Sequence, residues 1–306
     1  MTARADLEAA GALPGRIIDL SRVRHPRERR VLILSAAANL ALVAAAVTAI
    51  LLAPAWLSAH PHTAQLVRRV QLAAVAAVLL APALGFLRLG RWMMIHLNSV
   101  RLGRDQLPEV HAILERHCRV LGIPEPALYV SALPGIGLSD ALALGSCGTR
   151  AIVLGEKLFD GVGDIAERDD VFAFVIGHEL GRIHLGHASW WTELLLGYLK
   201  RIPVLRLPLV TVQTYSRDRM AALLAPGSLA AIALSASGGE IFGAVNVRAY
   251  VREALVPAPR PLPARLGAVL RKEPHLADRV HELHRHGFFR PDAELAEPAP
   301  RPTTGT

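Results

Sequence analysis

The chain contains little cysteine, and this scarcity limits the kinds of protein it can be. Only Cys118 and Cys147 are cysteines, and their spacing matches neither a CxxC pair nor a crowded framework. A small secreted domain held together by disulfides is therefore disfavoured, and a reducing compartment such as the cytoplasm fits better. The chain also lacks a Gly-x-Ser-x-Gly motif, so nothing indicates a serine nucleophile.

Acidic residues are also fewer than basic ones, since 26 Asp and Glu stand against 34 Lys and Arg, giving a formal net charge of +8. This balance can indicate nucleic-acid binding, but the arginines gather beside apolar runs, as Arg29 and Arg30 do. Positive charge that flanks apolar runs is typical of membrane proteins. A nucleic-acid partner is therefore not expected, and contact with nucleic acid or anionic lipid is kept only as a third hypothesis.

Two long runs without any charged residue follow near the N-terminus, Val31–Leu57 and Val70–Leu87. About 20 apolar residues cross the hydrocarbon core of a bilayer, so the two runs are predicted to form a transmembrane hairpin. Two alternatives stay open, a cleaved signal peptide for the first run and a buried Ala-rich core helix for the second. The lipid bilayer is thus the first predicted partner.

The arginines also predict how the hairpin is oriented. Those before the first run and after the second outnumber Arg68 and Arg69 in the loop between the runs. The positive-inside rule then predicts a multi-pass protein of the cell membrane whose two termini and main domain are cytoplasmic. The predicted parts are a basic polar tail at 1–30, the hairpin at 31–90, the main domain at 91–290 and a disordered tail at 291–306.

The main domain is predicted to be α+β and mainly helical, with a small β-sheet. Apolar residues recur at helical spacing from Leu107 to Leu121. Three strand-like runs and a long apolar helix follow, at 127–130, 141–144, 151–154 and 171–187. The apolar segment Trp190–Leu199 leaves two alternatives open, contact with a membrane interface or packing in the core.

The helix predicted at 171–187 carries most of the chemistry. Its sequence VFAFVIGHELGRIHLGH places His178 and Glu179 as the first two residues of a His-Glu-x-x-His pattern. In such a helix the two histidines bind one zinc ion and the Glu activates the zinc-bound water. The second histidine would fall at position 182, where Arg182 offers no lone pair to a metal.

Four segments share their order and spacing with one known family. They are SDALALG at Ser139–Gly145, the strand Ala151–Leu154, HELGRIHLGH at His178–His187 and PHLADRVHEL at Pro274–Leu283. In these segments the chain resembles the HtpX-type and CAAX-prenyl-protease-type family of integral-membrane zinc metallopeptidases. The resemblance implies a zincin-like domain that faces the cytoplasm. It also implies an extended strand that holds a peptide substrate by β-augmentation, here Asp140, Ala141, Leu142 and Ala143.

Carried over position by position, the resemblance makes His178 the first zinc ligand and Glu179 the general base. The family's third ligand is a Glu in a Ser-Arg-x-x-Glu-x-x-Ala-Asp-Arg pattern. That pattern matches VTVQTYSRDR at Val210–Arg219, which puts Thr214 in the place of the Glu. A second alignment puts Met220 there. Two of the three expected protein ligands are replaced on either alignment.

Two hypotheses on function follow. In the first, the chain is a degenerate pseudopeptidase that binds zinc weakly or not at all. It then holds a peptide or membrane-protein partner as a scaffold or regulator, and Arg182 pairs with Glu179 in place of the metal. In the second, it is an active zinc endopeptidase that cleaves membrane or misfolded proteins with a rearranged ligand set. A shifted set of His184, His187 and Glu193 requires the helix to end before His184, because both histidines lie on other faces than the first ligand.

Overall fold

The computed structural model describes residues 20–59, 62, 64–133, 139–144, 149–159, 165–226, 229–237, 242–256 and 273–289. Within these residues the molecule is mostly helical and contains one small sheet. The predicted disordered tail at 291–306 and the second cysteine, Cys147, lie outside the described residues.

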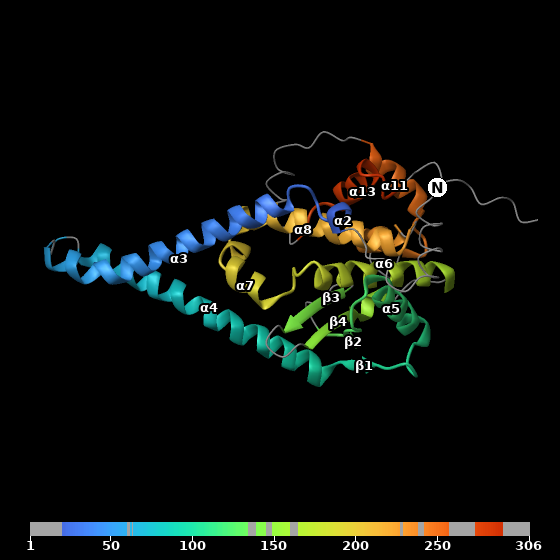
Figure 1. The fold of residues 1–306 in the computed structure, drawn as a ribbon, viewed down its shortest axis with the longest axis horizontal. Helices are drawn as coiled ribbons and strands as arrows, with labels where there is room; N and C mark the ends of the chain where they lie inside the picture. The colour runs from blue at the N-terminus through green and yellow to red at the C-terminus, as the bar shows by residue number, and fades with distance from the viewer. Residues whose placement is uncertain are drawn as a thin grey trace, which may run out of the picture.

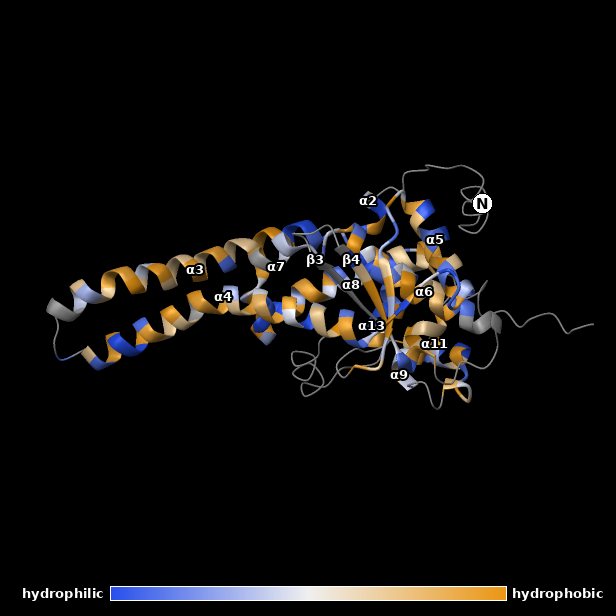
Figure 2. Ribbon diagram, turned by 90° about the horizontal axis from the view of Figure 1, so that it is seen from below, coloured by the Kyte–Doolittle hydropathy of each residue, from blue (hydrophilic) through white to orange (hydrophobic). Residues whose placement is uncertain are grey.

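Two long helices run side by side away from the rest of the molecule and diverge where they approach it (Figure 1). They are α3, Glu28–Ala59, and α4, Ala64–Asn98. By length and composition each could cross a membrane, and most of the side chains along them are not covered by the protein. Apolar residues predominate along both helices, with polar residues among them (Figure 2). Both predicted apolar runs are therefore helical, and the helices continue past the runs into the flanking charged residues.

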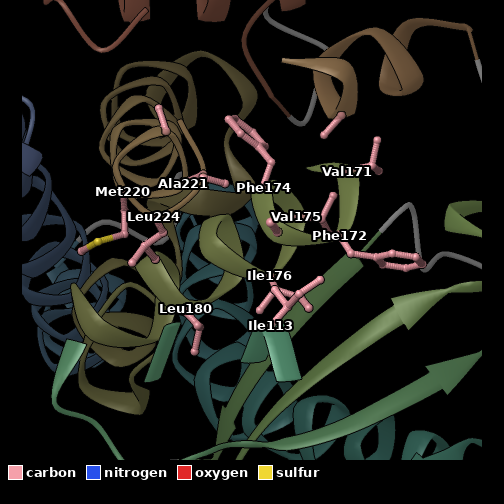
Figure 3. Packing of buried hydrophobic residues seen from close by; sticks show 14 of the residues in the cluster. Ile113, Val171, Phe172, Phe174, Val175, Ile176, Leu180, Met220, Ala221 and Leu224 are labelled. Atoms are coloured by element: carbon pink, nitrogen blue, oxygen red, sulfur yellow. The ribbon is translucent and has the colours of Figure 1, made fainter. Parts of the chain in front are cut away.

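The core of the domain is organised around α6, Ile165–His184, which packs against α8, Pro203–Leu224, and α5, Pro108–Leu121. Every residue of α6 from Val171 to Leu180 is buried, which explains why this stretch is apolar on all sides before its polar residues begin. Figure 3 shows side chains of α6 meeting those of α5 and of the end of α8, among them Ile113, Ile176 and Met220.

Two glycines allow α6 and α8 to approach closely. A Cβ atom on Gly177 would lie 3.1 Å from the Cα of Ala221, and one on Gly181 would lie 3.0 Å from the Cβ of Met220. Distances this short leave no room for a larger residue unless the helices move apart. The close approach also brings His178, which lies between these glycines, within hydrogen-bonding distance of Asp218 on α8.

The sheet lies beside α6 and has four strands in the order β1-β2-β4-β3. Strand β2 pairs with β4 in parallel, and β3 pairs with β4 antiparallel, so that β3 is an edge strand of the described sheet. The three predicted strands are confirmed with slightly wider bounds. The strands are Val100–Leu102, Ala127–Ser131, Ser139–Leu144 and Thr149–Gly155, for β1 to β4.

Shorter helices surround this frame. They are α2 (Leu20–Val23), η2 (Glu156–Leu158), α7 (Trp190–Leu196), η3 (Leu199–Arg201), α9 (Ala230–Ser237), α11 (Val247–Leu255) and α13 (Leu276–Arg285). In both overall views α7 lies between α3 and α4 at the end where these two helices reach the domain (Figures 1 and 2).

The structure differs from the predicted polar tail at residues 20–30. Helix α2 packs on α8, and Val23 and Glu28 are fully buried. A sequence prediction based on local composition misses this packing, because the groups that cover these residues come from more than 150 positions further along the chain. The first residues of α3 therefore belong to the domain and are not part of a free tail.

Candidate functional site

The candidate site lies in the second half of α6, where His178 and Glu179 are both buried. Arg182 stands less than one helical turn further on, with 31% of its side chain exposed. Its Nη1 lies 3.9 Å from Oε2 of Glu179, so the predicted i, i+3 ion pair forms, at the long end of the range for such a contact. The positive charge of Arg182 thus lies next to the Glu179 carboxylate, which is buried away from solvent.

His178 is held in place by Asp218, from the facing helix α8. The distance from His178 Nδ1 to Asp218 Oδ1 is 2.9 Å. A carboxylate can only accept, so Nδ1 carries the donated proton and the neutral ring keeps its lone pair on Nε2. Arg279 from α13 donates to both oxygens of Asp218, from Nε at 2.8 Å and from Nη2 at 2.7 Å. A buried three-residue network therefore orients the ring.

The charges within this network stabilise one another. Burial by itself would raise the pKa of the Asp218 carboxyl, but Arg279 and the hydrogen bond from His178 hold that pKa well below its usual range. Burial would likewise lower the pKa of Arg279, and Asp218 raises it above its ordinary value instead. Glu273 approaches the same guanidinium, with its Oε2 3.4 Å from Nη1. Asp218 and Arg279 are therefore both charged near neutral pH.

Thr214, the residue predicted in the place of the third ligand, is fully buried on α8. Its Oγ1 accepts a hydrogen bond of 2.7 Å from Nη2 of Arg217, whose Nε donates to the carbonyl oxygen of Gln213 at 3.3 Å. Burial, followed by the nearby positive charge of Arg182, lowers the pKa of Arg217. Two guanidinium groups thus lie close to the predicted ligand positions.

These residues do not fit a catalytic zinc ion. Such an ion takes three protein ligands that offer lone pairs and leaves one position for water. Beside His178 the chain offers instead the cations Arg182 and Arg217, and a Thr214 hydroxyl that already accepts from one of them. Among the residues that the structure describes, no three His, Cys, Asp or Glu side chains come together as a possible metal site.

His187, the second histidine of the alternative ligand set, has a structural role. The helix ends at His184, not before it, and His187 lies buried in the next turn. Nε2 of His187 donates to Oε1 of Glu28 at 2.9 Å, and Ser216 Oγ donates to the other oxygen of that carboxylate. This contact, which we call the Glu28 junction, joins the start of α3 to α6 and α8. The side chain of Glu193, the third member of the alternative ligand set, lies outside the described part.

The predicted peptide strand lies beside this site. Asp140, Ala141, Leu142 and Ala143 are in β3, opposite Val153, Ile152, Ala151 and Arg150 of β4. Strand β3 contacts α6, and its other edge carries no described strand. An edge strand with open backbone groups has the geometry that β-augmentation requires.

Three residues of the site were not predicted from the sequence, namely Asp218, Arg279 and Arg217. Arg279 lies within Pro274–Leu283, which carries the family resemblance, and Asp218 lies within Val210–Arg219, which was aligned with the third-ligand pattern, but neither was given a role. The signal that could have identified Asp218 is its position four residues after Thr214, which puts both on one face of α8. Arg217 stands in the place of an Ala on the alignment through Thr214, whereas the alignment through Met220 makes Ser216 and Arg217 the Ser-Arg of the family pattern, and that match could have identified it.

A central helix with a buried His-Glu pair, oriented from a second helix and flanked by a small sheet, is the framework of a metallopeptidase domain. Residues 105–280 match peptidase family M48. The match covers more than half of the chain, and the chain belongs to this family. No curated protein and no solved structure matches it.

Proposed function

We propose that this chain is a membrane-anchored, HtpX-like member of family M48 that has lost its hydrolytic metal site. It holds a peptide or a membrane-protein partner as a scaffold or regulator. The observation that carries the proposal is the pair of arginines, Arg182 against Glu179 and Arg217 against Thr214, at the places where the family's remaining ligands belong. The structural parts around them, His178 oriented by Asp218 above all, are retained.

Arg182 and Arg217 disfavour metal binding in two ways. Their side chains offer no lone pair to a metal, and their positive charge repels it. A unit positive charge about 5 Å from Zn²⁺ opposes its binding by roughly 6 kcal/mol at an effective dielectric constant of about 20. That energy corresponds to about four powers of ten in affinity. Without a bound metal, Glu179 has no metal-bound water to activate, and Arg182 compensates its buried charge instead.

In this proposal α3 and α4 cross the membrane as a hairpin. Their uncharged stretches are long enough to span a bilayer, and the arginines on the domain side outnumber the two in the loop. Both termini and the domain then lie in the cytoplasm. The bound partner pairs with the open edge of β3 at Asp140–Ala143, which supports the choice of an extended peptide or an unfolded segment of a membrane protein.

The metal content of the detergent-purified protein tests the loss of the site. We expect no stoichiometric zinc by mass spectrometry in the natural protein. The substitutions Arg182→His and Thr214→Glu restore the two ligands, but Arg217 would still pair with the new carboxylate. The triple variant that also carries Arg217→Ala is therefore expected to gain about one zinc per chain.

Two controls make this result specific. Adding His178→Ala to the triple variant should remove the gained zinc, and Arg252→His, which introduces a histidine on the exposed side of α11, should gain none. Stoichiometric zinc in the natural protein would contradict the proposal and would favour an active endopeptidase with a rearranged ligand set.

Photo-crosslinking tests the peptide strand separately. A photoreactive residue in place of Leu142 on β3 should capture a chemically unfolded model protein, whereas the same residue in place of Glu115, on the outward side of α5, should not. Equal capture at the two positions would refute binding at the sheet edge and leave the metal result unaffected.

A further inference from the structure

The chain between α6 and α8 touches both long helices. We call residues 188–206 the α7 segment, which comprises α7, η3 and the first residues of α8. The carbonyl oxygen of Ala188 accepts from Nη2 of Arg88 on α4 at 2.6 Å. Oδ1 of Asn39 on α3 accepts from the backbone N–H groups of Tyr198 and Leu199, at 3.2 and 3.4 Å. The α7 segment therefore joins the two helices where they diverge (Figure 1).

These two contacts lie at matching levels along the hairpin. Beyond Asn39, α3 stays uncharged from residue 40 to residue 57, and α4 is uncharged from residue 70 to residue 87, directly before Arg88. Each stretch is about 27 Å long at 1.5 Å per residue. A hydrocarbon core is about 30 Å thick. Arg88 therefore marks the boundary of the hydrocarbon core on the domain side of α4. On α3 the uncharged run continues past Asn39 to Val31, and Asn39 lies at about the level of Arg88, so the α7 segment that contacts both residues lies at that boundary.

The exposed surface of the α7 segment has the composition of a membrane interface. Trp190 is 40% and Trp191 60% exposed, and they are accompanied by further exposed apolar residues, Leu195, Ile202, Val204 and Leu205. Tryptophan is enriched where a membrane protein meets the headgroups, since its ring is apolar and its N–H is polar. Exposed groups of large apolar side chains are uncommon on surfaces that face only water.

The charges of the segment match the same surroundings. Lys200, Arg201 and Arg206 interrupt the apolar residues, against one acidic residue, Glu193. Basic side chains next to a membrane surface attract anionic headgroups, by about 1 kcal/mol each. Their aliphatic stems also lie along apolar surface while the charged ends stay in the headgroup layer.

We propose that the α7 segment is a third membrane contact of this protein, which lies in the headgroup layer on the domain side and binds anionic lipid. The inference rests on the proposed hairpin, because the bilayer is placed by α3 and α4. It goes beyond the hairpin, because it attaches the domain itself to the lipid surface. The two loosely covered tryptophans and the three basic residues are its binding groups.

Tryptophan quenching tests the contact on the full chain reconstituted in phosphatidylcholine and phosphatidylglycerol vesicles. In a variant with Trp56→Phe and Trp92→Phe only Trp190 and Trp191 fluoresce. Lipids brominated near the glycerol end of their acyl chains should quench this pair, more strongly than lipids brominated near the chain ends. Aqueous iodide should quench it less than it quenches free tryptophan. A companion variant that keeps only Trp56, near the far end of α3, reports on the hairpin.

The two variants separate the possible failures. If Trp56 is quenched by brominated lipid and the Trp190 and Trp191 pair is not, the third contact is refuted while the hairpin stands. If neither is quenched, the hairpin fails and the third contact fails with it. Replacing Lys200 and Arg201 by Gln should reduce the quenching of the pair in vesicles that contain phosphatidylglycerol, and an unchanged signal would refute the role of anionic lipid.

Discussion

The buried carboxylate of Asp218 provides the sharpest test of how the site is held together. It is 1% exposed and accepts three hydrogen bonds, two from Arg279 and one from His178. The substitution Asp218→Asn keeps the size of the side chain and removes its charge. The amide NH₂ group then faces the donors of Arg279, so a buried guanidinium loses its counter-ion and one acceptor.

The size of the effect follows from this burial. Removing one partner of a buried ion pair costs about 3 to 5 kcal/mol, mostly because the remaining charge stays out of water. In a domain of about 200 residues each kcal/mol lowers the melting temperature by roughly 2 to 4 °C. Asp218→Asn should therefore lower the melting temperature by about 10 °C, measured by intrinsic fluorescence in detergent.

A matched control comes from the same network. Glu273 also contacts Arg279, but at 3.4 Å and with about half of its side chain exposed, so Glu273→Gln should cost no more than about 1 kcal/mol. The double variant Asp218→Asn, Arg279→Met should be less destabilised than the sum of its single variants, because no charge is left unpaired. Equal melting temperatures for the Asn and the Gln variants would refute the reasoning.

Three further predictions concern stability. Burial lowers the pKa of His117 to about 3, so the unfolded chain binds one more proton than the folded domain below about pH 6.5, and stability is lost as the pH falls. The loss approaches roughly 5 kcal/mol near pH 3, and His117→Leu should flatten the profile of melting temperature against pH. Gly177→Val forces a side chain against the Ala221 backbone and should destabilise the domain by about 1 to 3 kcal/mol. The readout is a lower melting temperature or the loss of soluble expression. An unchanged melting temperature would contradict the close contact. Glu28→Ala leaves His187 without its acceptor and should make residues 20–30 sensitive to protease, whereas His187→Gln, which still donates, should protect them better.

The parts of the fold that depend on local composition were predictable from the sequence. Long uncharged runs indicate apolar helices whatever the rest of the chain does. The helix predicted at Leu107–Leu121 and the three predicted strands depend only on spacing and turn residues. The contact between Arg182 and Glu179 was predictable for the same reason, since residues three apart on a helix are neighbours.

The parts that depend on contacts distant in sequence were not predictable in this way. The Glu28 junction joins residues separated by 159 and 188 positions, and no periodicity indicates such a pairing. Arg217 and Thr214 are neighbours on α8, but the burial of Arg217 depends on how closely α6 approaches it, which Gly181 of α6 allows. Residues 1–30 were therefore predicted to be a polar tail, although α2, within this stretch, packs on α8.

The Glu28 junction also determines how freely the domain can move relative to the helices that carry it. Because the first turn of α3 is hydrogen-bonded to Ser216 of α8 and to His187, which directly follows α6, α3 is attached rigidly to the centre of the domain. On the proposed orientation, the domain stands over the bilayer at a fixed height and tilt. The open edge of β3 is then held at a constant distance from the lipid. A membrane-embedded partner therefore needs a linker of matching length between its membrane segment and the segment that pairs with β3.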